Sequence, residues 1–546
     1  MPLNLYSLTN PSLFISSPAS RRSAYSLKQK LRLAASALHL HFVRFSEVHK
    51  FEKPRDRKAL DLMISCAAAV MEEYADIIFS YGYSDEFSFI LKKESKFYQR
   101  RGSKILSLLV SFFTSVYTIK WKDFFPHQKL LYAPSFHAQI IQCPTLEVLQ
   151  TYLAWRQNDC HLNNLYDTCY WKLFEREKSE TKAHGRLKGT QKREKNELLF
   201  QEFCFNYKTL HLMLRQGTCL FKTQIEEVVK YKENGDPIKR LRKKMMEVHS
   251  DNIAGKSFWN QHSSLLSELG RFEVDIHKIR PEYVESFLFQ DKLMLSTWIV
   301  VRIDGCHFHR FSDIHKFEKP NDEKALKLMN ACAAALLEEF QDITFAYGVS
   351  DEFSFVVKKE SKFYERQPSA IVSTMVSFFS TMYISKWNEF FPETELNYPP
   401  SFDGRAVCYP SSKILRDYLS WRQVDCHINN QYNTCFWMLV DSVKSKREAQ
   451  NYLKGTQTQE KNDLLARNGI DYNALPDIFR RGSSIFRDKE NKTLMEVNCA
   501  EDSRKKIVIE HCNIIDDDFW DSHPWILGDK LPLESANTRA MKRTIG

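Results

Sequence analysis

The chain carries one sequence pattern twice. Between Lys50 and Arg100, 36 of 51 residues are identical to those of Lys316–Arg366, at a constant offset of 266 positions. A length of 546 residues suits two to four domains. The repeat therefore predicts two domains of one fold, so that the pattern of one copy can be interpreted for both.

The second copy has the pattern of an α+β domain. A short β-branched run at 298–303 and two apolar runs at 343–347 and 353–357 predict buried strands. Between them, apolar residues recur at three- and four-residue spacing from Ala325 to Phe340, which predicts one amphipathic helix. The order strand, helix, strand, turn, strand is half of a ferredoxin-like βαββαβ unit. We therefore expect tandem palm-like domains of this α+β class, with helical additions.

This order brings two carboxylates together, those of Asp304 and Asp351. Asp304 ends the first strand, and Asp351 lies 47 residues later in the turn between the next two strands. If the first strand lies beside that hairpin, both side chains point off the same edge of the sheet. Mg²⁺ takes oxygen ligands and needs only one or two carboxylates plus substrate phosphates, and two such ions support phosphoryl transfer. Each Asp alone favours an ordinary turn, whereas the pair favours a metal site.

Five blocks in the second copy resemble the motifs of the tRNA(His) guanylyltransferase family, in that family's order. The resemblance extends over nearly all of the chain from about residue 41, because the pattern occurs twice. The blocks are Arg302–Gly305, Phe308–Phe311, Phe317–Asp322, Ser350–Phe355 and His427–Asn433.

The resemblance implies an enzyme that adds a G to the 5′ end of tRNA(His). In this family ATP first activates the 5′-monophosphate of the tRNA, the 3′-hydroxyl of GTP then displaces AMP, and pyrophosphate is finally removed from the added G. The implied cofactor is Mg²⁺, as two ions, and the implied substrates are ATP, GTP and tRNA(His). The implied assembly is a homo-oligomer, a dimer of two-copy chains, with no membrane partner.

The resemblance also implies roles for individual residues. Asp304 and Asp351 are the expected catalytic residues and, with the backbone carbonyl of Gly305, the expected metal ligands. Cys306 departs from the family, where many relatives carry Arg, and Gln367 and Ala370 replace an expected basic pair. The expected GTP-binding residues are Asp304, Gly305, Cys306, His307, Phe308, His309, Ser350 and Asp351, and the candidate substrate contacts are Lys319, Glu352, His427, Asn429 and Asn430.

The first copy departs from the second at its beginning. From His41 onward it matches, but Leu38 stands where Asp304 stands, and nothing upstream resembles the strand from Trp298. We expect this copy to lack its first strand and one metal carboxylate, so that catalysis resides in the second copy. The expected divisions are a basic Ser-rich leader (1–40), the first copy (41–222), a basic connector and first-copy tail (223–280), the catalytic second copy (281–490) and its C-terminal tail (491–546).

Charge and cysteine content bear on partners and location. The formal net charge is +10, and the cationic run Lys239–Lys244 is interpreted as a solvated helix face, a nuclear-import signal or a phosphate-contacting patch. Thirteen Cys without regular spacing predict reduced thiols inside a cell. We expect the nucleus or the cytoplasm as the location, although the acid-free residues 1–46 also have the composition of an organellar transit peptide.

Two other classes of protein share these features. One is a related palm enzyme, such as a nucleotidyl cyclase or a general 5′-end tRNA repair polymerase that is not restricted to tRNA(His). The other is a non-catalytic repeat protein whose copies only grip tRNA. The intact pair Asp304 and Asp351 argues against the non-catalytic protein.

Overall fold

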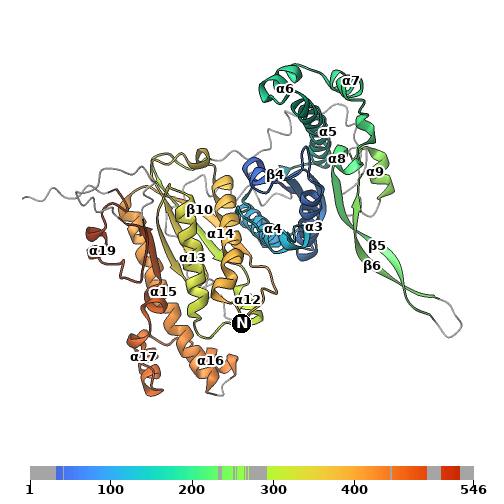
Figure 1. Cartoon of the computed structure of the whole chain (residues 1–546). Helices are drawn as coiled ribbons and strands as arrows, with labels where there is room; N and C mark the ends of the chain where they lie inside the picture. Colours follow the sequence, from blue (N-terminus) through green and yellow to red (C-terminus); the bar gives the residue numbers. More distant parts are fainter. Residues whose placement is uncertain are drawn as a thin grey trace, which may run out of the picture. The chain divides into compact units, whose positions relative to one another are not determined.

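The computed structural model describes residues 42–231, 237–249, 292–442, 445–488 and 506–528, parts of 252–269, and the backbone of 32–40. The chain divides into two compact units, each built mainly from one copy of the repeat (Figure 1). The described residues up to Leu269, together with Val372–Thr381, form one unit, and Lys292–Ile371 with the described residues from Met382 onward form the other. Residues 1–31 of the expected leader (1–40), and residues 270–291, 489–505 and 529–546, lie outside the described residues.

The second copy is a mixed helix and antiparallel-sheet domain. Its sheet has the strand order β10-β7-β9-β8-β11-β12, and every described pair is antiparallel. The predicted strands and helix are confirmed as β7 (Trp298–Gly305), β8 (Ile343–Val349), β9 (Glu352–Val357) and α13 (Glu323–Glu339). The other elements are α12 (Phe308–Ile314), α14 (Pro368–Phe390), β10 (Phe402–Tyr409), α15 (Ser412–Asp441), α16 (Lys446–Leu453), α17 (Thr458–Arg467), α18 (Asp477–Arg481), β11 (Ser483–Arg487), β12 (Ile507–Glu510) and α19 (Asp517–Ser522).

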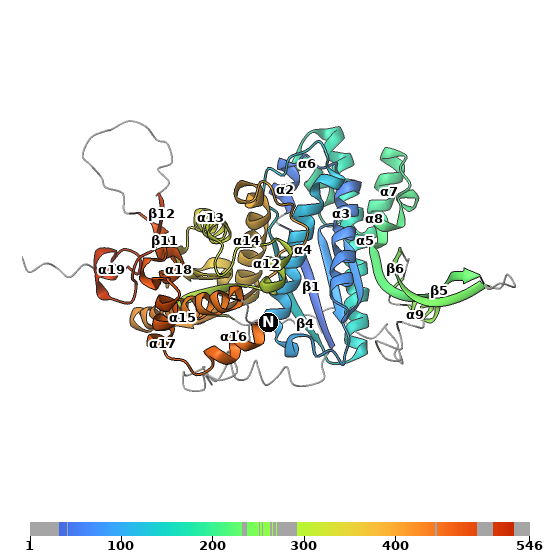
Figure 2. The same ribbon diagram turned by 90° about the horizontal axis from the view of Figure 1, so that it is seen from below.

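The first copy repeats this order, with its sheet arranged β4-β1-β3-β2-β5-β6. Helices cover both faces of that sheet (Figures 1 and 2). Its elements are β1 (Arg32–Leu40), α2 (Phe42–Val48), α3 (Arg57–Glu73), β2 (Ile77–Tyr83), β3 (Glu86–Leu91), α4 (Gly102–Phe124), β4 (Phe136–Cys143), α5 (Leu146–Glu177), α6 (Glu180–Leu187), α7 (Lys192–Phe203), α8 (Leu212–Gln216), β5 (Thr218–Tyr231), β6 (Pro237–Val248) and α9 (Lys256–Gln261).

The core of the first copy lies on the two faces of its sheet. Because side chains alternate along a strand, neighbouring residues of β3 serve opposite faces, with Phe89 packing against α3 and α4 and Ile90 packing towards α5. Helix α4 is long and apolar enough to cross a membrane by length and composition, but 72% of its most apolar window is buried inside the structure. It is a core helix of this unit.

The expectation that the first copy lacks its first strand is wrong. The segment Arg32–Leu40, expected to belong to an unrelated leader, forms β1 and pairs with both β3 and β4. Its pairing of Ala34 with Ile90 corresponds, at the offset of 266, to that of Val300 with Val356. Strands β3 and β4 both have backbone groups that need hydrogen-bond partners. A segment between them can therefore pair through its backbone even where its side-chain pattern differs.

The end of β1 differs from the end of β7. A bulge between Ser36 and His39 shifts the register against β4, so that His39 pairs with His137 where Asp304 pairs with Asp403. No Asp or Glu occurs in residues 32–40. The strand is therefore present, but the carboxylate at its end is not, as the sequence predicted.

The tail of each copy packs back on its own sheet. Phe258 and Trp259 of α9 are buried against Phe79 and Phe221, and α19 occupies the corresponding place in the second copy. Beyond Phe221, β5 pairs only with β6 among the described residues, and both views show this two-stranded ribbon standing away from the sheet (Figures 1 and 2). The basic run Lys239–Lys244 lies on β6, so its interpretation as a helix face is wrong.

Candidate active site

The fold brings Asp304 and Asp351 to the same edge of the second copy's sheet. Asp304 is the penultimate residue of β7 and pairs with Glu352, while Asp351 lies in the turn before β9. The amide of Gly305 donates a hydrogen bond to the carbonyl of Asp351 at 2.9 Å, which fixes the two backbones together. Burial, and then the negative charge of Asp304, raises the pKa of Asp351 to about 7. Burial and the neighbouring carboxylate of Asp304 thus both disfavour the ionised form of Asp351.

Gly305 is required for this approach. A Cβ atom on Gly305 would lie 2.8 Å from Oδ2 of Asp351 and 2.4 Å from Cδ2 of Phe308. Only a residue without a side chain lets the end of β7 come this close to the Asp351 carboxylate. The Asp-Gly pair in the sequence is therefore a requirement of close packing as well as a turn signal.

Glu352 is held by two arginines rather than presented to a substrate. Its carboxylate is buried and forms ion pairs with Nη1 of Arg302 at 3.2 Å and with Nη2 of Arg422 at 2.7 Å. Arg302 also donates from Nη2 to Oδ2 of Asp304 at 2.8 Å. The two arginines therefore connect the metal-side carboxylates to α15, a function that the sequence prediction missed. The signal was the placement of Arg302 two residues before Asp304, on the same face of the strand.

The loop after Gly305, which holds most of the predicted GTP-binding residues, follows directly after the carboxylate of Asp304. The amide of Cys306 donates to the carbonyl of Ser401 at 2.7 Å, and His307 and Ser350 both have left-handed backbones, with φ of 57° and 53°. His307 and His309 are exposed. The Phe308 ring instead packs against Phe311 and Phe402, each with ring centroids 5.0 Å apart, and so supports the loop from within.

The remaining candidate substrate contacts are Lys319 and three residues of α15. Nζ of Lys319 donates to Oγ of Ser312 at 2.7 Å, and burial lowers the pKa of this amine. His427, Asn429 and Asn430 lie in the middle of α15. Asn430 is buried and accepts from Nδ2 of Asn321 at 2.9 Å, while Asn429 is exposed. Asn430 is thus a structural link between α15 and the loop before α13.

His427 lies next to Tyr472, whose hydroxyl donates to the carbonyl of His427 at 3.1 Å. Burial, followed by the charge of Arg480, lowers the pKa of His427. The neutral imidazole is therefore the favoured form near pH 7. Together with the exposed Asn429, it leaves a polar stretch of α15 accessible.

The residues at this edge fit the Mg²⁺ ions that the resemblance implies. Asp304 and Asp351 offer hard oxygen ligands, and a bound cation would offset the burial and the carboxylate repulsion that raise the pKa of Asp351. Within the described ranges, no group of three or more His, Cys, Asp or Glu side chains gathers to hold a metal ion. A divalent ion here would therefore depend on substrate phosphates and water as further ligands, which is the arrangement of an enzyme of phosphoryl or nucleotidyl transfer.

Comparison with known proteins agrees with this class. The sequence matches the family described as tRNAHis guanylyltransferase over residues 39–144 and 281–410, and the family described as Thg1 C terminal domain over residues 147–259 and 413–516. The chain belongs to the tRNA(His) guanylyltransferase family and is a nucleotidyltransferase of tRNA processing. Each family match occurs twice, as the internal repeat predicts.

Two relatives match most of this chain. tRNA(His) guanylyltransferases 1 and 2 of Arabidopsis thaliana are 63% and 61% identical over 487 and 503 residues, which cover 89% of this chain in both cases and 86% and 94% of those proteins. Among solved structures, a crystal structure of the tRNA(His) guanylyltransferase of Saccharomyces cerevisiae is 42% identical, with a TM-score of 0.37, covering 40% of this chain and 97% of that chain.

Proposed function

We propose that the second copy carries the catalysis, which is the addition of a G to the 5′ end of tRNA(His) by ATP-activated, 3′-to-5′ nucleotidyl transfer. The observation that carries this assignment is the interacting pair Asp304 and Asp351, of which the first copy retains only the counterpart of Asp351, Asp85. The strand order β10-β7-β9-β8, with helices between the strands, supports a palm-like βαββαβ arrangement for this domain.

Two Mg²⁺ ions are the proposed cofactors, held by Asp304, Asp351 and the backbone carbonyl of Gly305. The ions supply positive charge that neutralises the phosphates as they approach one another. The residues of the chain itself position the two carboxylates. Gly305 permits the close approach of the Asp351 carboxylate, and the Arg302 guanidinium fixes Asp304 through the 2.8 Å hydrogen bond.

The loop of Cys306, His307, Phe308 and His309, with Ser350, is proposed to hold GTP. His307 and His309 are exposed beside the carboxylates, whereas Phe308 acts by packing under the loop. His427 and Asn429 are proposed to contact the tRNA end, since a neutral imidazole and an exposed amide suit hydrogen bonds to RNA. Lys319, Glu352 and Asn430 are proposed to position these elements rather than to contact the substrate, because each is occupied by a partner within the domain.

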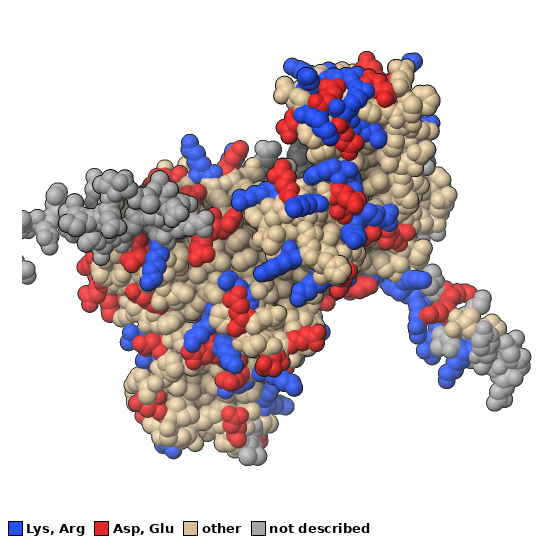
Figure 3. All heavy atoms as spheres, viewed as in Figure 1, with Lys and Arg blue, Asp and Glu red and all other residues tan. Residues whose placement is uncertain are grey.

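The first copy is proposed to help hold tRNA, in a dimer of two-copy chains that supplies four copies in all. The ribbon of β5 and β6 would carry its positive charge, since Arg240, Arg242, Lys243 and Lys244 are exposed there; Figure 3 shows Lys and Arg side chains on it, together with Asp and Glu side chains. The nucleus or the cytoplasm is the proposed location.

Transfer of labelled GTP to a 5′-monophosphorylated tRNA(His) that lacks the extra G tests the assignment. The full chain is expected to transfer one G with ATP and Mg²⁺ present, and to leave tRNA of other identities unlabelled. Labelling of 5′-truncated tRNAs of any identity, with whichever nucleotide the opposite strand templates, would instead establish the general repair polymerase. Tight tRNA binding without any transfer would establish the non-catalytic protein.

A further inference from the structure

The first copy contains a pair of opposite charges where the second copy has two amides. Arg55 stands at the position of Asn321, and Asp167 at the position of Asn433, both at the offset of 266. In the structure Nη2 of Arg55 donates to Oδ2 of Asp167 at 2.6 Å, so the two replacements form one ion pair. It joins the loop before α3 to helix α5.

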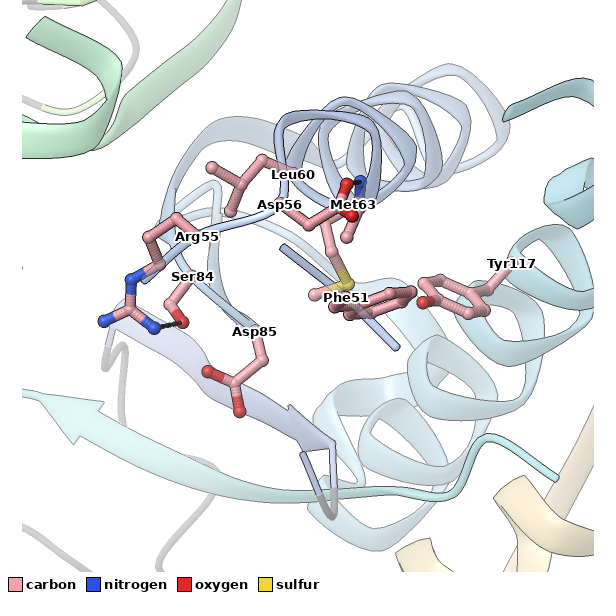
Figure 4. A pocket seen from close by; sticks show the side chains of 9 residues that line it. Phe51, Arg55, Asp56, Leu60, Met63, Ser84, Asp85 and Tyr117 are labelled. Carbon is pink, nitrogen blue, oxygen red and sulfur yellow. Dashed lines mark hydrogen bonds between the residues drawn. The ribbon is translucent and has the colours of Figure 1, made fainter. Parts of the chain in front are cut away.

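Arg55 also reaches the turn that carries the remaining carboxylate. Its Nη1 donates to Oγ of Ser84 at 2.7 Å, and Ser84 directly precedes Asp85. Arg55, Ser84 and Asp85 line one pocket together with Phe51 and Tyr117. Figure 4 shows the guanidinium, the hydroxyl and the Asp85 carboxylate on the same side of this pocket, away from the two rings.

The corresponding residue of the second copy turns to a different partner. Asn321 donates its amide to Asn430 of α15 at 2.9 Å and brings no charge to the turn of Ser350 and Asp351. That turn instead faces the second carboxylate, Asp304. Beside this turn the second copy therefore has the carboxylate of Asp304. Beside the equivalent turn the first copy has the guanidinium of Arg55.

A guanidinium excludes a divalent ion from such a place for two reasons. It has only N–H donors and no lone pair to coordinate a metal, and its fixed charge repels a cation at short range. The side chain of Arg55 is only 14% exposed and is held by hydrogen bonds to two elements, so it is not a surface group that can swing away freely. The strand β1, moreover, contains no Asp or Glu to complete the site.

We propose that the first copy binds no divalent ion, and that Arg55 supplies as a fixed side chain the positive charge that metal ions supply in the second copy. The chain then has one metal centre and two copies of the fold. Burial raises the pKa of Asp167, Arg55 opposes this shift, and the negative charge of Asp85 adds to it. Arg55 pairs with Asp167 and donates to Ser84 beside Asp85, so one fixed cation holds the turn and α5 together. This inference rests on the proposed metal site of the second copy.

Titration of the full chain with Mn²⁺ in the presence of GTP, followed by the electron paramagnetic resonance of free Mn²⁺, tests the proposal by counting bound ions. Asp351→Ala is expected to remove the tightly bound ions, whereas Asp85→Ala is expected to leave their number and affinity unchanged. A loss of bound Mn²⁺ in Asp85→Ala would overturn the proposal. If neither variant changes Mn²⁺ binding, the assignment of the metal site to the second copy is wrong. That result would contradict the proposed function and is distinct from a loss of Mn²⁺ in Asp85→Ala, which would contradict only this inference.

An exchange between the copies tests Arg55 itself. The double variant Asn321→Arg, Asn433→Asp rebuilds the ion pair of the first copy inside the second, with both metal carboxylates intact. Mn²⁺ affinity is expected to fall by at least about tenfold through the added guanidinium charge, with an unchanged thermal unfolding transition. Unweakened Mn²⁺ binding in the folded double variant would contradict the proposal. Asn321→Gln is the matched neutral control, and the Asp85→Ala comparison stands if the double variant does not fold.

Discussion

Glu352 and Arg422 form a buried ion pair of 2.7 Å that fastens the start of β9 to helix α15. Arg422 also donates to Asp425 at 3.0 Å and lies over the ring of Trp421. In the first copy Glu86 and Arg156 make the same ion pair, although Asp304 has no counterpart there. The pair is thus part of the architecture of both copies, and in the second copy it also holds the residue next to Asp351.

Glu352→Gln is expected to destabilise the second copy and to lower its activity. The change leaves the buried Arg422 without its carboxylate partner, and removal of one partner of a buried pair costs about 3–5 kcal/mol. The measurement is thermal unfolding together with the rate of guanylyl transfer. Glu86→Gln is the matched control, expected to lower the unfolding temperature of the first copy without changing the rate at saturating tRNA. Equal rates of guanylyl transfer for the two variants would show that Glu352 does not support catalysis.

Asp304→Ala and Asp351→Ala are each expected to reduce guanylyl transfer by about 10³-fold or more, because each removes a negative charge that holds the metal ions. Asp85→Ala in the first copy is expected to retain the rate of the unchanged chain. Single-turnover labelling of tRNA(His) with GTP gives the three rates directly. An Asp85→Ala chain as slow as Asp351→Ala would move catalysis to both copies.

The sequence predicted the elements whose pattern is local. The β-branched run at Trp298 and the helical spacing from Ala325 to Phe340 became β7 and α13, because strand and helix periodicity are visible over ten to fifteen residues. The carboxylate edge followed from the order of these elements. The absence of a carboxylate at the end of β1 followed from composition alone.

Features that depend on distant partners were not predictable in this way. Residues 32–40 carry no strand signal of their own, and their place between β3 and β4 is decided by the two neighbouring strands. The Glu352 bridge joins residues 70 positions apart in sequence, and Asp167 lies 112 positions from Arg55. The basic run on β6 was interpreted as a helix face because nearly all of its residues are charged. It therefore shows no alternation of polar and apolar side chains, although it pairs with β5 as a strand.

His161 of the first copy is expected to destabilise the protein in acid. Burial, followed by the charges of Lys192 and Arg215, lowers its pKa to about 4 from an ordinary value of 6.5. Between these two values the unfolded chain binds a proton that the folded chain does not, so stability falls as the pH falls from 6.5 to 4. In thermal unfolding across this range, His161→Gln is expected to lose less stability than the unchanged chain. Parallel curves for the two proteins would show that this imidazole does not contribute.

The ribbon of β5 and β6 is expected to contact tRNA phosphates. Its four exposed cations stand on a strand that leaves the sheet, and the ion pair of Arg242 with Glu227 is itself exposed and so contributes little. Substituting Gln for Lys239, Arg240, Arg242, Lys243 and Lys244 is expected to weaken tRNA binding. It is also expected to flatten the dependence of log Kd on log salt concentration by about 0.7–0.9 for each phosphate that the ribbon no longer neutralises. Filter-binding titrations at several salt concentrations give this slope, and the Asp85→Ala chain serves as a variant that leaves the ribbon unchanged. An unaltered slope would leave nuclear import as the function of the basic run.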